Sequence, residues 1–311
     1  MFQLPSTQEE WKKIAKDFND KCNFVHNLGG MDGMHVEVIP EKNTGSFYFN
    51  YKNKFSMVLL AIVDANYKFI LCDFGTNGRV SDGGVFLNSD FYEMLQKNLL
   101  NIPPEEKLDN SQRVLPYVFV ADDAFPLNKN IMKPFRQSEL DSTAKRIFNY
   151  RLSRARLVTE NCFGILSQRF RIFRTRINLT PKRVESVEMA ICALHNYLMS
   201  SLPDYYAPPE NLEDGSTITD FTIDSTFPDF TTDNIIDSTF PDFTTDNTID
   251  STFPDFTTNN IIDSTYQDLD HIESRQARSA LSLAKKIRNK FMDYFNNEGK
   301  VPWQDNMIAN D

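Results

Sequence analysis

The sequence predicts an α/β protein in which a mixed β-sheet carries helices on its faces. Residues 55–64 are almost continuously apolar, as expected of a strand that is buried on both faces. Residues 34–38 alternate between apolar and polar side chains, which indicates a half-buried strand. Long helical patterns follow at residues 143–171 and 184–199. The order of elements, with strands first, helices later and one strand preceded by a helix, favours a mixed sheet covered by helices.

The other elements follow from shorter patterns. An amphipathic helix is expected at residues 8–18, with Ser6 and Thr7 at its start. Residues 67–74 are predicted to return from the strand at 55–64 and to form a hairpin with it. The remaining elements expected in this part are a helix at 86–99, a loop at 101–113 and a short buried strand at 117–121.

The composition changes after residue 202. A unit of 13 residues, rich in Asp, Thr, Phe and Pro, repeats from Asp224, Asp237 and Asp250, and a degraded copy begins at Asp263. Each unit holds too few apolar side chains to offset the entropy of an ordered chain, so we expect disorder there. An amphipathic helix is expected at residues 277–295. The predicted organisation is therefore a globular domain at 1–202, a repeat linker at 203–270 and a C-terminal helical tail at 271–311.

The totals bound the class of protein. A chain of 311 residues with 41% hydrophobic residues can bury a sizeable core. The net charge of −10 argues against a nucleic-acid partner, but much of the acid lies in the repeats. The four cysteines are scattered without a CxxC pair, as expected of reduced core residues in an intracellular protein. No apolar run has transmembrane length, so we expect no membrane partner.

Four acidic residues carry most of the functional information. Asp32 lies in the glycine-rich segment 29–33 before an alternating strand, and Asp82 lies in a Ser-Asp-Gly-Gly turn. Both positions are ordinary for a turn residue. Asp122 ends a buried strand, where a carboxylate is costly unless it is paired or bound to metal. Its neighbour Asp123 competes for the same role, and spacing alone does not choose between them.

Glu160 is the most unusual of the four. It shares a helix face with Leu157, Phe163 and Gly164, where a carboxylate is unexpected. Pairing with Arg154 or Arg156 is the alternative explanation. Converging carboxylates repel one another unless a cation or protons neutralise them. Because no His or Cys cluster accompanies them, an all-oxygen site favours Mg²⁺ or Mn²⁺.

Basic residues cluster around Glu160 and are interrupted by few acids. They form either a solvated helix face or a surface that contacts DNA phosphates. The DNA-binding candidates are Arg151, Arg154, Arg156, Arg169, Arg171, Arg174 and Arg176. His35 and His195 are predicted to make structural polar contacts.

Several segments together resemble the PIF/Harbinger transposases and the Harbinger transposase-derived nucleases. The resemblance covers roughly residues 1–200, and the matching segments are 28–36, 47–51, 56–67, 78–86, 121–126, 148–173 and 194–197. It implies an RNase H-like fold and a metal site of the DDE type. By resemblance, Asp32, Asp122 and Glu160 are catalytic, Asp82 is a further ligand, and the four hold two divalent cations. The match that ends at Pro126 selects Asp122 over Asp123.

The resemblance implies a metal-dependent DNA endonuclease or transposase domain. Family members carry a helix-turn-helix region upstream of the segment at which this chain begins, which motivates an alternative: a catalytically inactive, domesticated module that binds DNA or protein. An RNase H-type enzyme acting on RNA–DNA hybrids would use the same site. The resemblance also implies a Myb-like DNA-binding partner and a possible homo-oligomer. The expected location is the nucleus, with the cytoplasm second.

Overall fold

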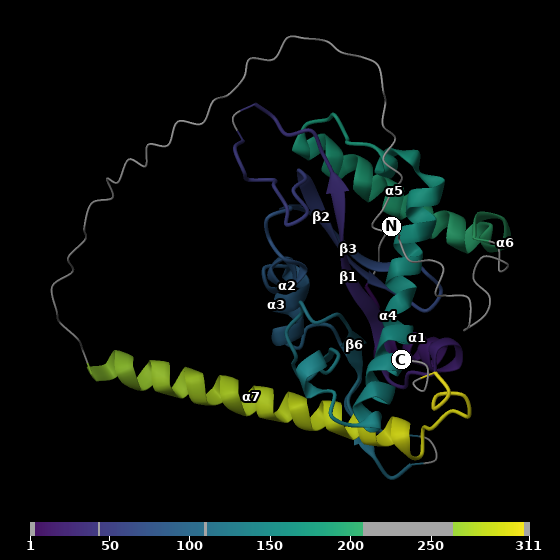
Figure 1. The fold of residues 1–311 in the computed structure, drawn as a ribbon, viewed down its shortest axis with the longest axis vertical. Helices are drawn as coiled ribbons and strands as arrows, with labels where there is room; N and C mark the ends of the chain where they lie inside the picture. The colour runs from purple at the N-terminus through teal and green to yellow at the C-terminus, as the bar shows by residue number, and fades with distance from the viewer. Residues whose placement is uncertain (1–3, 43, 109–110, 208–263, 308–311) are drawn as a thin grey trace.

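The computed structural model contains a five-stranded mixed sheet with helices on both faces (Figure 1). It describes residues 4–42, 44–108, 111–207 and 264–307, with side chains from 277 onward in the last range. The sheet order is β3-β2-β1-β6-β7. Its strands are β1 Asn27–Glu37, β2 Ser56–Val63, β3 Phe69–Asn77, β6 Val118–Val120 and β7 Ile131–Met132. The first three pair antiparallel, whereas β6 pairs parallel with both β1 and β7.

This architecture confirms the predicted α/β class and is consistent with the RNase H-like fold. The α-helices are α1 Gln8–Cys22, α2 Asp82–Leu87, α3 Asp90–Gln96, α4 Thr143–Arg169, α5 Pro181–Ser201, α6 Pro203–Tyr206 and α7 Ser264–Asn296. Two 3₁₀ turns, Gln137–Glu139 and Arg171–Arg174, and a small hairpin of β4 Glu106–Lys107 and β5 Val114–Leu115 complete the described elements. Helix α1 begins where the sequence predicts, because Thr7 and Glu10 form a reciprocal capping box.

Strand β1 is longer than predicted and includes the glycine-rich segment. The prediction that Asp32 precedes the strand was wrong: Asp32 lies inside β1, opposite Ala61 of β2. The glycines belong to the strand because their neighbours approach closely. A Cβ on Gly29 would meet Ile62 Cγ2 at 2.6 Å, and one on Gly30 would overlap Thr159 Oγ1 of α4. Gly30 therefore allows α4 to pack directly on the strand that carries Asp32, and Gly29 makes room for Ile62 of β2.

The predicted helix at residues 86–99 is instead two short helices. Ser89 separates them, because its Oγ donates to Phe86 O at 2.7 Å and accepts from Tyr92 N at 3.2 Å. Ser89 therefore caps the start of α3. Helix α2 begins at Asp82 with Ser81 as its N-cap, so the turn predicted around Asp82 is the start of a helix.

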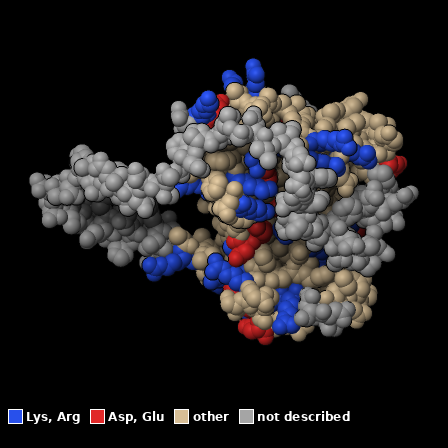
Figure 2. Space-filling view, turned by 45° about the horizontal axis from the view of Figure 1, so that its top comes forward, with Lys and Arg blue, Asp and Glu red and all other residues tan. Residues whose placement is uncertain are grey.

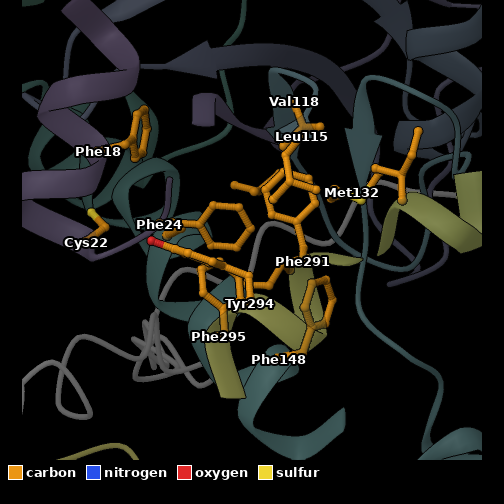
Figure 3. Packing of buried hydrophobic residues seen from close by; sticks show 14 of the residues in the cluster. Phe18, Cys22, Phe24, Leu115, Val118, Met132, Phe148, Phe291, Tyr294 and Phe295 are labelled. Carbon is orange, nitrogen blue, oxygen red and sulfur yellow. The ribbon is translucent and has the colours of Figure 1, made fainter. Parts of the chain in front are cut away.

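The C-terminal helix α7 belongs to the core. Phe291, Tyr294 and Phe295 pack against Phe24 and Phe148 (Figure 3). The rings of Phe24 and Phe295 are 4.8 Å apart between centroids. Sequence segments far apart in the chain thus share one cluster, and the C-terminal helix covers apolar side chains of α1, β6 and α4.

Buried polar groups tie the C-terminal segment to α4. Arg151 is 2% exposed and donates to Gln304 Oε1 at 2.9 Å, Gly299 O at 3.2 Å and Asn23 O. Its guanidinium also lies over the Phe295 ring, 4.5 Å from the centroid. Gln304 in turn donates to Phe295 O at 2.9 Å. These bonds satisfy the two Nη groups of a charge that would be costly to bury alone, whereas the buried Nε has no hydrogen-bond partner.

Smaller expectations are also confirmed. The four cysteines are buried and free, as predicted for core residues. His195 is structural: its ring nitrogens lie 2.7 Å from Tyr67 O and 3.0 Å from the Tyr206 hydroxyl. None of the helices in the described ranges is both long and apolar enough to cross a membrane.

Candidate active site

Asp32 lies on β1, and Asp122 lies just beyond the end of the neighbouring parallel strand β6. Gly30 of β1 is in register with Val120 of β6, so each aspartate follows its paired residue by two positions. Strand β6 ends at Val120, which places Asp122 just beyond its carboxyl end, beside the middle of β1. Two residues along a strand return to the same face. The two carboxylates therefore arise at adjacent positions of the sheet.

Helix α4 brings Glu160 to the same place. The helix crosses β1 so closely that Val158 and Thr159 lie against Gly30. Glu160 follows them directly, and 32% of its side chain is exposed. The glycine in β1 and the small hydroxyl side chain in α4 set this approach.

Arg156 connects the two acids. Its Nη1 lies 3.1 Å from Asp32 Oδ2, and its Nη2 lies 2.6 Å from Glu160 Oε1. Only 22% of the arginine side chain is exposed. The pairing of Arg156 with Glu160, which the sequence offered as the alternative explanation of that glutamate, is thus present. The contact with Asp32 shows in addition that Asp32 and Glu160 meet across one guanidinium.

Burial is the main cause that raises the pKa of Asp32 to about 7, and the nearby charges of Asp122 and Glu160 contribute to the same shift. Arg156 and the amide of Gly33 act in the opposite direction. The Gly33 amide donates to Asp32 Oδ1 at 2.9 Å. These influences place all three predicted catalytic acids within one electrostatic neighbourhood. Strongly perturbed carboxyls of this kind are typical of functional sites.

Asp82 approaches from the other face of β1. A Cβ on Gly33 would overlap the Asp82 carboxylate, whereas Asp32, one residue earlier, faces Arg156 of α4. Successive strand residues point to opposite faces. Burial, followed by the charge of Asp122, raises the pKa of Asp82 to about 6. Asp122 is therefore the acid close to both Asp32 and Asp82.

Asp122 and Asp123 have different surroundings. Asp122 Oδ1 accepts from the Ala124 amide at 2.9 Å, and its charge acts on Asp32 and Asp82. Asp123 is 52% exposed and pairs with Lys133 at 2.9 Å. Only Asp122 therefore belongs to the acidic neighbourhood.

The predicted DNA-binding arginines are divided between several environments. Arg151 is buried against the C-terminal segment, and Arg154 lies over the Trp303 ring, 4.7 Å from its centroid. Arg169 donates to Tyr206 O and Tyr205 O, and Arg174 donates to Ser167 O. The exposed members are Arg169, Arg171, Arg174 and Arg176. Figure 2 shows acidic side chains in a hollow of one face, with Lys and Arg side chains beside them.

The residues fit a hard divalent cation in their chemistry. The donors are all carboxylate oxygens. Asp82 Oδ1 is buried without a hydrogen-bond partner, as expected of an atom that lacks its ligand. As the side chains lie here, no three His, Cys, Asp or Glu groups in the described ranges are arranged to enclose an ion. Arg156 instead supplies positive charge to Asp32 and Glu160.

Sequence reasoning missed two features of the site. The first is the contact of Arg156 with Asp32, because the sequence predicts for Arg156 only a pairing with Glu160, four residues away on the helix, or a role in binding DNA. The side of β1 occupied by Asp82 has no signal in the sequence, because it depends on where α2 packs.

Comparison with known proteins agrees with this geometry. The model of the DDE superfamily endonuclease family matches residues 31–196, more than half of the chain. A curated relative, Protein ALP1-like from Arabidopsis thaliana, is 29% identical over 200 residues, which cover 63% of this chain and 48% of the relative. The chain thus spans about half the length of that relative. No solved structure gives a significant match. The chain therefore belongs to the DDE superfamily endonuclease family, as its resemblance to the PIF/Harbinger transposases and Harbinger transposase-derived nucleases predicts.

Proposed function

We propose that this chain is a metal-dependent DNA endonuclease or transposase domain with Asp32, Asp122 and Glu160 as its catalytic acids. The observation that carries the proposal is their convergence. Asp32 lies on β1 and Asp122 just beyond the end of the adjacent parallel strand β6, and Arg156 joins Asp32 to Glu160 across the helix–sheet interface. Asp32 has two acidic neighbours, although only 15% of its side chain is exposed to solvent, which is rare for a carboxylate without a function.

Asp32, Asp122, Glu160 and Asp82 are the residues that would hold divalent cations, Mg²⁺ or Mn²⁺. The chemistry that two cations would supply there is activation of a nucleophile at neutral pH and neutralisation of charge on the leaving oxygen of a phosphodiester. The protein itself keeps the Asp32 carboxylate largely out of water and fixes it through the Gly33 amide. Arg156 holds Asp32 and Glu160 together by charge-assisted bonds.

The DNA surface that we propose consists of exposed arginines that follow Glu160 in the chain. Arg171, Arg174 and Arg176 lie just beyond the C-terminal end of α4, and 70% of the Arg176 side chain is exposed. Guanidinium groups bind phosphate oxygens through paired donors. Phosphate contacts position DNA without reading its sequence. A separate Myb-like protein would then select the target sequence. A homo-oligomer would place one active site at each of the two DNA strands. The protein would act in the nucleus.

A nicking assay on supercoiled DNA tests this function. We expect Mn²⁺-dependent nicking by the full chain and a loss of at least 100-fold in Asp122→Asn and in Glu160→Gln, because each removes a catalytic carboxylate. Asp123→Asn is the matched control. It changes the adjacent acid, which pairs with Lys133 outside the acidic neighbourhood, and should keep the activity.

Equal nicking by all of these variants would refute the proposed site. DNA binding that persists in EDTA, with no cleavage in any metal, would favour the alternative of an inactive binding module. Parallel reactions on duplex DNA and on an RNA–DNA hybrid separate a DNA nuclease from an RNase H-type enzyme.

A further inference from the structure

The segment between β1 and β2 ends in a tight, preorganised turn. The side-chain oxygen of buried Asn50 accepts from the backbone amides of Lys52 and Lys54 at 2.9 and 3.0 Å. Its backbone amide donates to Lys54 O at 2.8 Å. Asn53 takes a left-handed conformation with φ of 60°. The Asn50 side chain also donates to Ser56 Oγ at 2.9 Å. The turn is therefore fixed at its base to β2.

Aromatic side chains on this turn face solvent. Tyr51 is 78% exposed, and Phe47 and Phe49 are 54% and 37% exposed. Phe49 contacts the Phe55 ring and Phe47 the Tyr48 ring, but the exposed part of each ring does not stabilise the fold, because only buried apolar surface does. Lys52 lies 5.5 Å from the centre of the Tyr51 ring, and among the described residues no carboxylate pairs with it.

The turn lies beside the acidic site. The centroid of the Tyr51 ring is 5.6 Å from that of the His35 ring. His35 is held in turn by a hydrogen bond between its Nδ1 and Ser56 Oγ, 2.9 Å apart. His35 is three residues from Asp32 on β1, about 10 Å along the strand. His35 also lies two residues from Gly33, where a Cβ would overlap the Asp82 carboxylate, so His35 and Asp82 share one face of β1.

We propose that Tyr51 is a stacking platform for an unpaired base of the DNA strand whose phosphate occupies the acidic site. This inference rests on the proposed nuclease function. The Tyr51 ring contacts His35, which is three residues from Asp32 on β1, so the stacked base would lie within a few nucleotides of the scissile phosphate. The flat ring stacks on a base of any sequence, and Lys52 meets the adjoining phosphate.

An unpaired base is the occupant that the chemistry favours. A paired base inside a duplex keeps its faces against its neighbours and is not available to a protein ring. An aromatic ring with an unpaired lysine beside it matches the combination of base and phosphate in a single strand. A protein partner that covers Phe47, Phe49 and Tyr51 is the competing occupant.

Binding of the full chain to fluorescent oligonucleotides in EDTA tests the proposal without cleavage. The probes are a DNA duplex and the same duplex with a gap of three nucleotides. Tyr51→Ala should weaken binding of the gapped probe by about 5- to 150-fold, the usual range for loss of one stacked base. It should change duplex binding by less than about twofold. Tyr51→Phe should retain the affinity, whereas Tyr51→Leu should lose most of it, because a leucine is apolar but cannot stack.

Tyr205→Ala is the matched control, since this tyrosine is 80% exposed and lies on α6, which Figure 1 draws on the opposite side from the segment between β1 and β2. It should leave both affinities unchanged. Equal binding of the gapped probe by Tyr51→Ala and the unaltered chain would overturn the proposal, as would full affinity in Tyr51→Leu. A loss of equal size on both probes would also overturn it. Because no cleavage is measured, these outcomes are independent of whether the chain cuts DNA.

Discussion

Replacing Asp32 with Asn should stabilise the metal-free protein while it abolishes nicking. Only 15% of the Asp32 side chain is exposed, and burial raises its pKa from an ordinary 3.8 to about 7. Keeping this carboxylate ionised in the fold is therefore unfavourable at neutral pH. Asparagine has the same shape without the charge, and the pair of Arg156 with Glu160 remains.

The magnitude follows from the pKa. A carboxyl whose pKa is higher in the folded state stabilises the fold fully below its unfolded pKa, and that contribution is lost as the pH rises through the folded pKa. The gain from Asp32→Asn should thus be near zero below pH 4, grow between pH 4 and 7, and level off above. A difference of about three pKa units corresponds to at most about 4 kcal/mol in the free energy of unfolding.

Urea denaturation in EDTA at pH 4 and pH 8 measures this gain. Saturating Mg²⁺ should then reduce it at pH 8, because an ion at 100 times its dissociation constant stabilises the unaltered protein by about 2.7 kcal/mol. Asp123→Asn, a change at an exposed and paired acid, should alter stability by less than about 1 kcal/mol. An Asp32→Asn variant that is no more stable than the unaltered chain at pH 8 would refute the reasoning.

Three further predictions concern the frame around the site. Glu188 is fully buried, both of its carboxylate oxygens lack hydrogen-bond partners, and burial raises its pKa to about 8. Glu188→Gln should therefore raise the free energy of unfolding by an amount that grows from pH 4.5 to 8 and reaches at most about 5 kcal/mol. Thermal melts at pH 5 and pH 9 measure this gain, and a gain that does not increase with pH would contradict the prediction. Phe291→Ala should lower the free energy of unfolding by about 3–5 kcal/mol in urea, because it empties part of the core shared by α4 and α7; a loss below about 1 kcal/mol would mean that α7 is not packed there. Gly30→Ala should lower both the thermal stability and the nicking activity, because the new Cβ would overlap Thr159. Gly164→Ala should be tolerated or slightly stabilising in the same assays, because a Cβ there would meet no atom within 4 Å. Equal effects of the two changes would argue against the close approach of α4 to β1.

The sequence predicts the parts of the fold that depend on local pattern. The continuous apolar run became β2, whose eight residues are all buried, and the long helical pattern became α4 with almost the predicted ends. Strand β7, of two residues, is too short to show a pattern. The glycines of β1 resemble a turn in sequence, and only the packing of Ile62 and Thr159 against them shows why they lie in a strand.

The candidate site follows the same division. That Glu160 is unusual can be seen from one helix face, and the structure indeed finds it half-buried beside Arg156. That Arg156 also reaches Asp32 depends on the crossing of α4 over β1, which no local pattern encodes. Arg151 resembles its neighbours in sequence but is buried, because the C-terminal segment folds back over that part of α4.

Diffraction from crystals soaked in Mn²⁺, recorded with the anomalous signal of manganese, tests the central claim most directly. We expect one or two manganese peaks with oxygens of Asp32, Asp122 and Glu160 at about 2.0–2.3 Å, and Arg156 turned away from at least one of its carboxylate partners. The crystals are soaked at a manganese concentration that saturates nicking. A map with no manganese at these carboxylates, in which Arg156 still bridges Asp32 and Glu160, would contradict the proposed metal site.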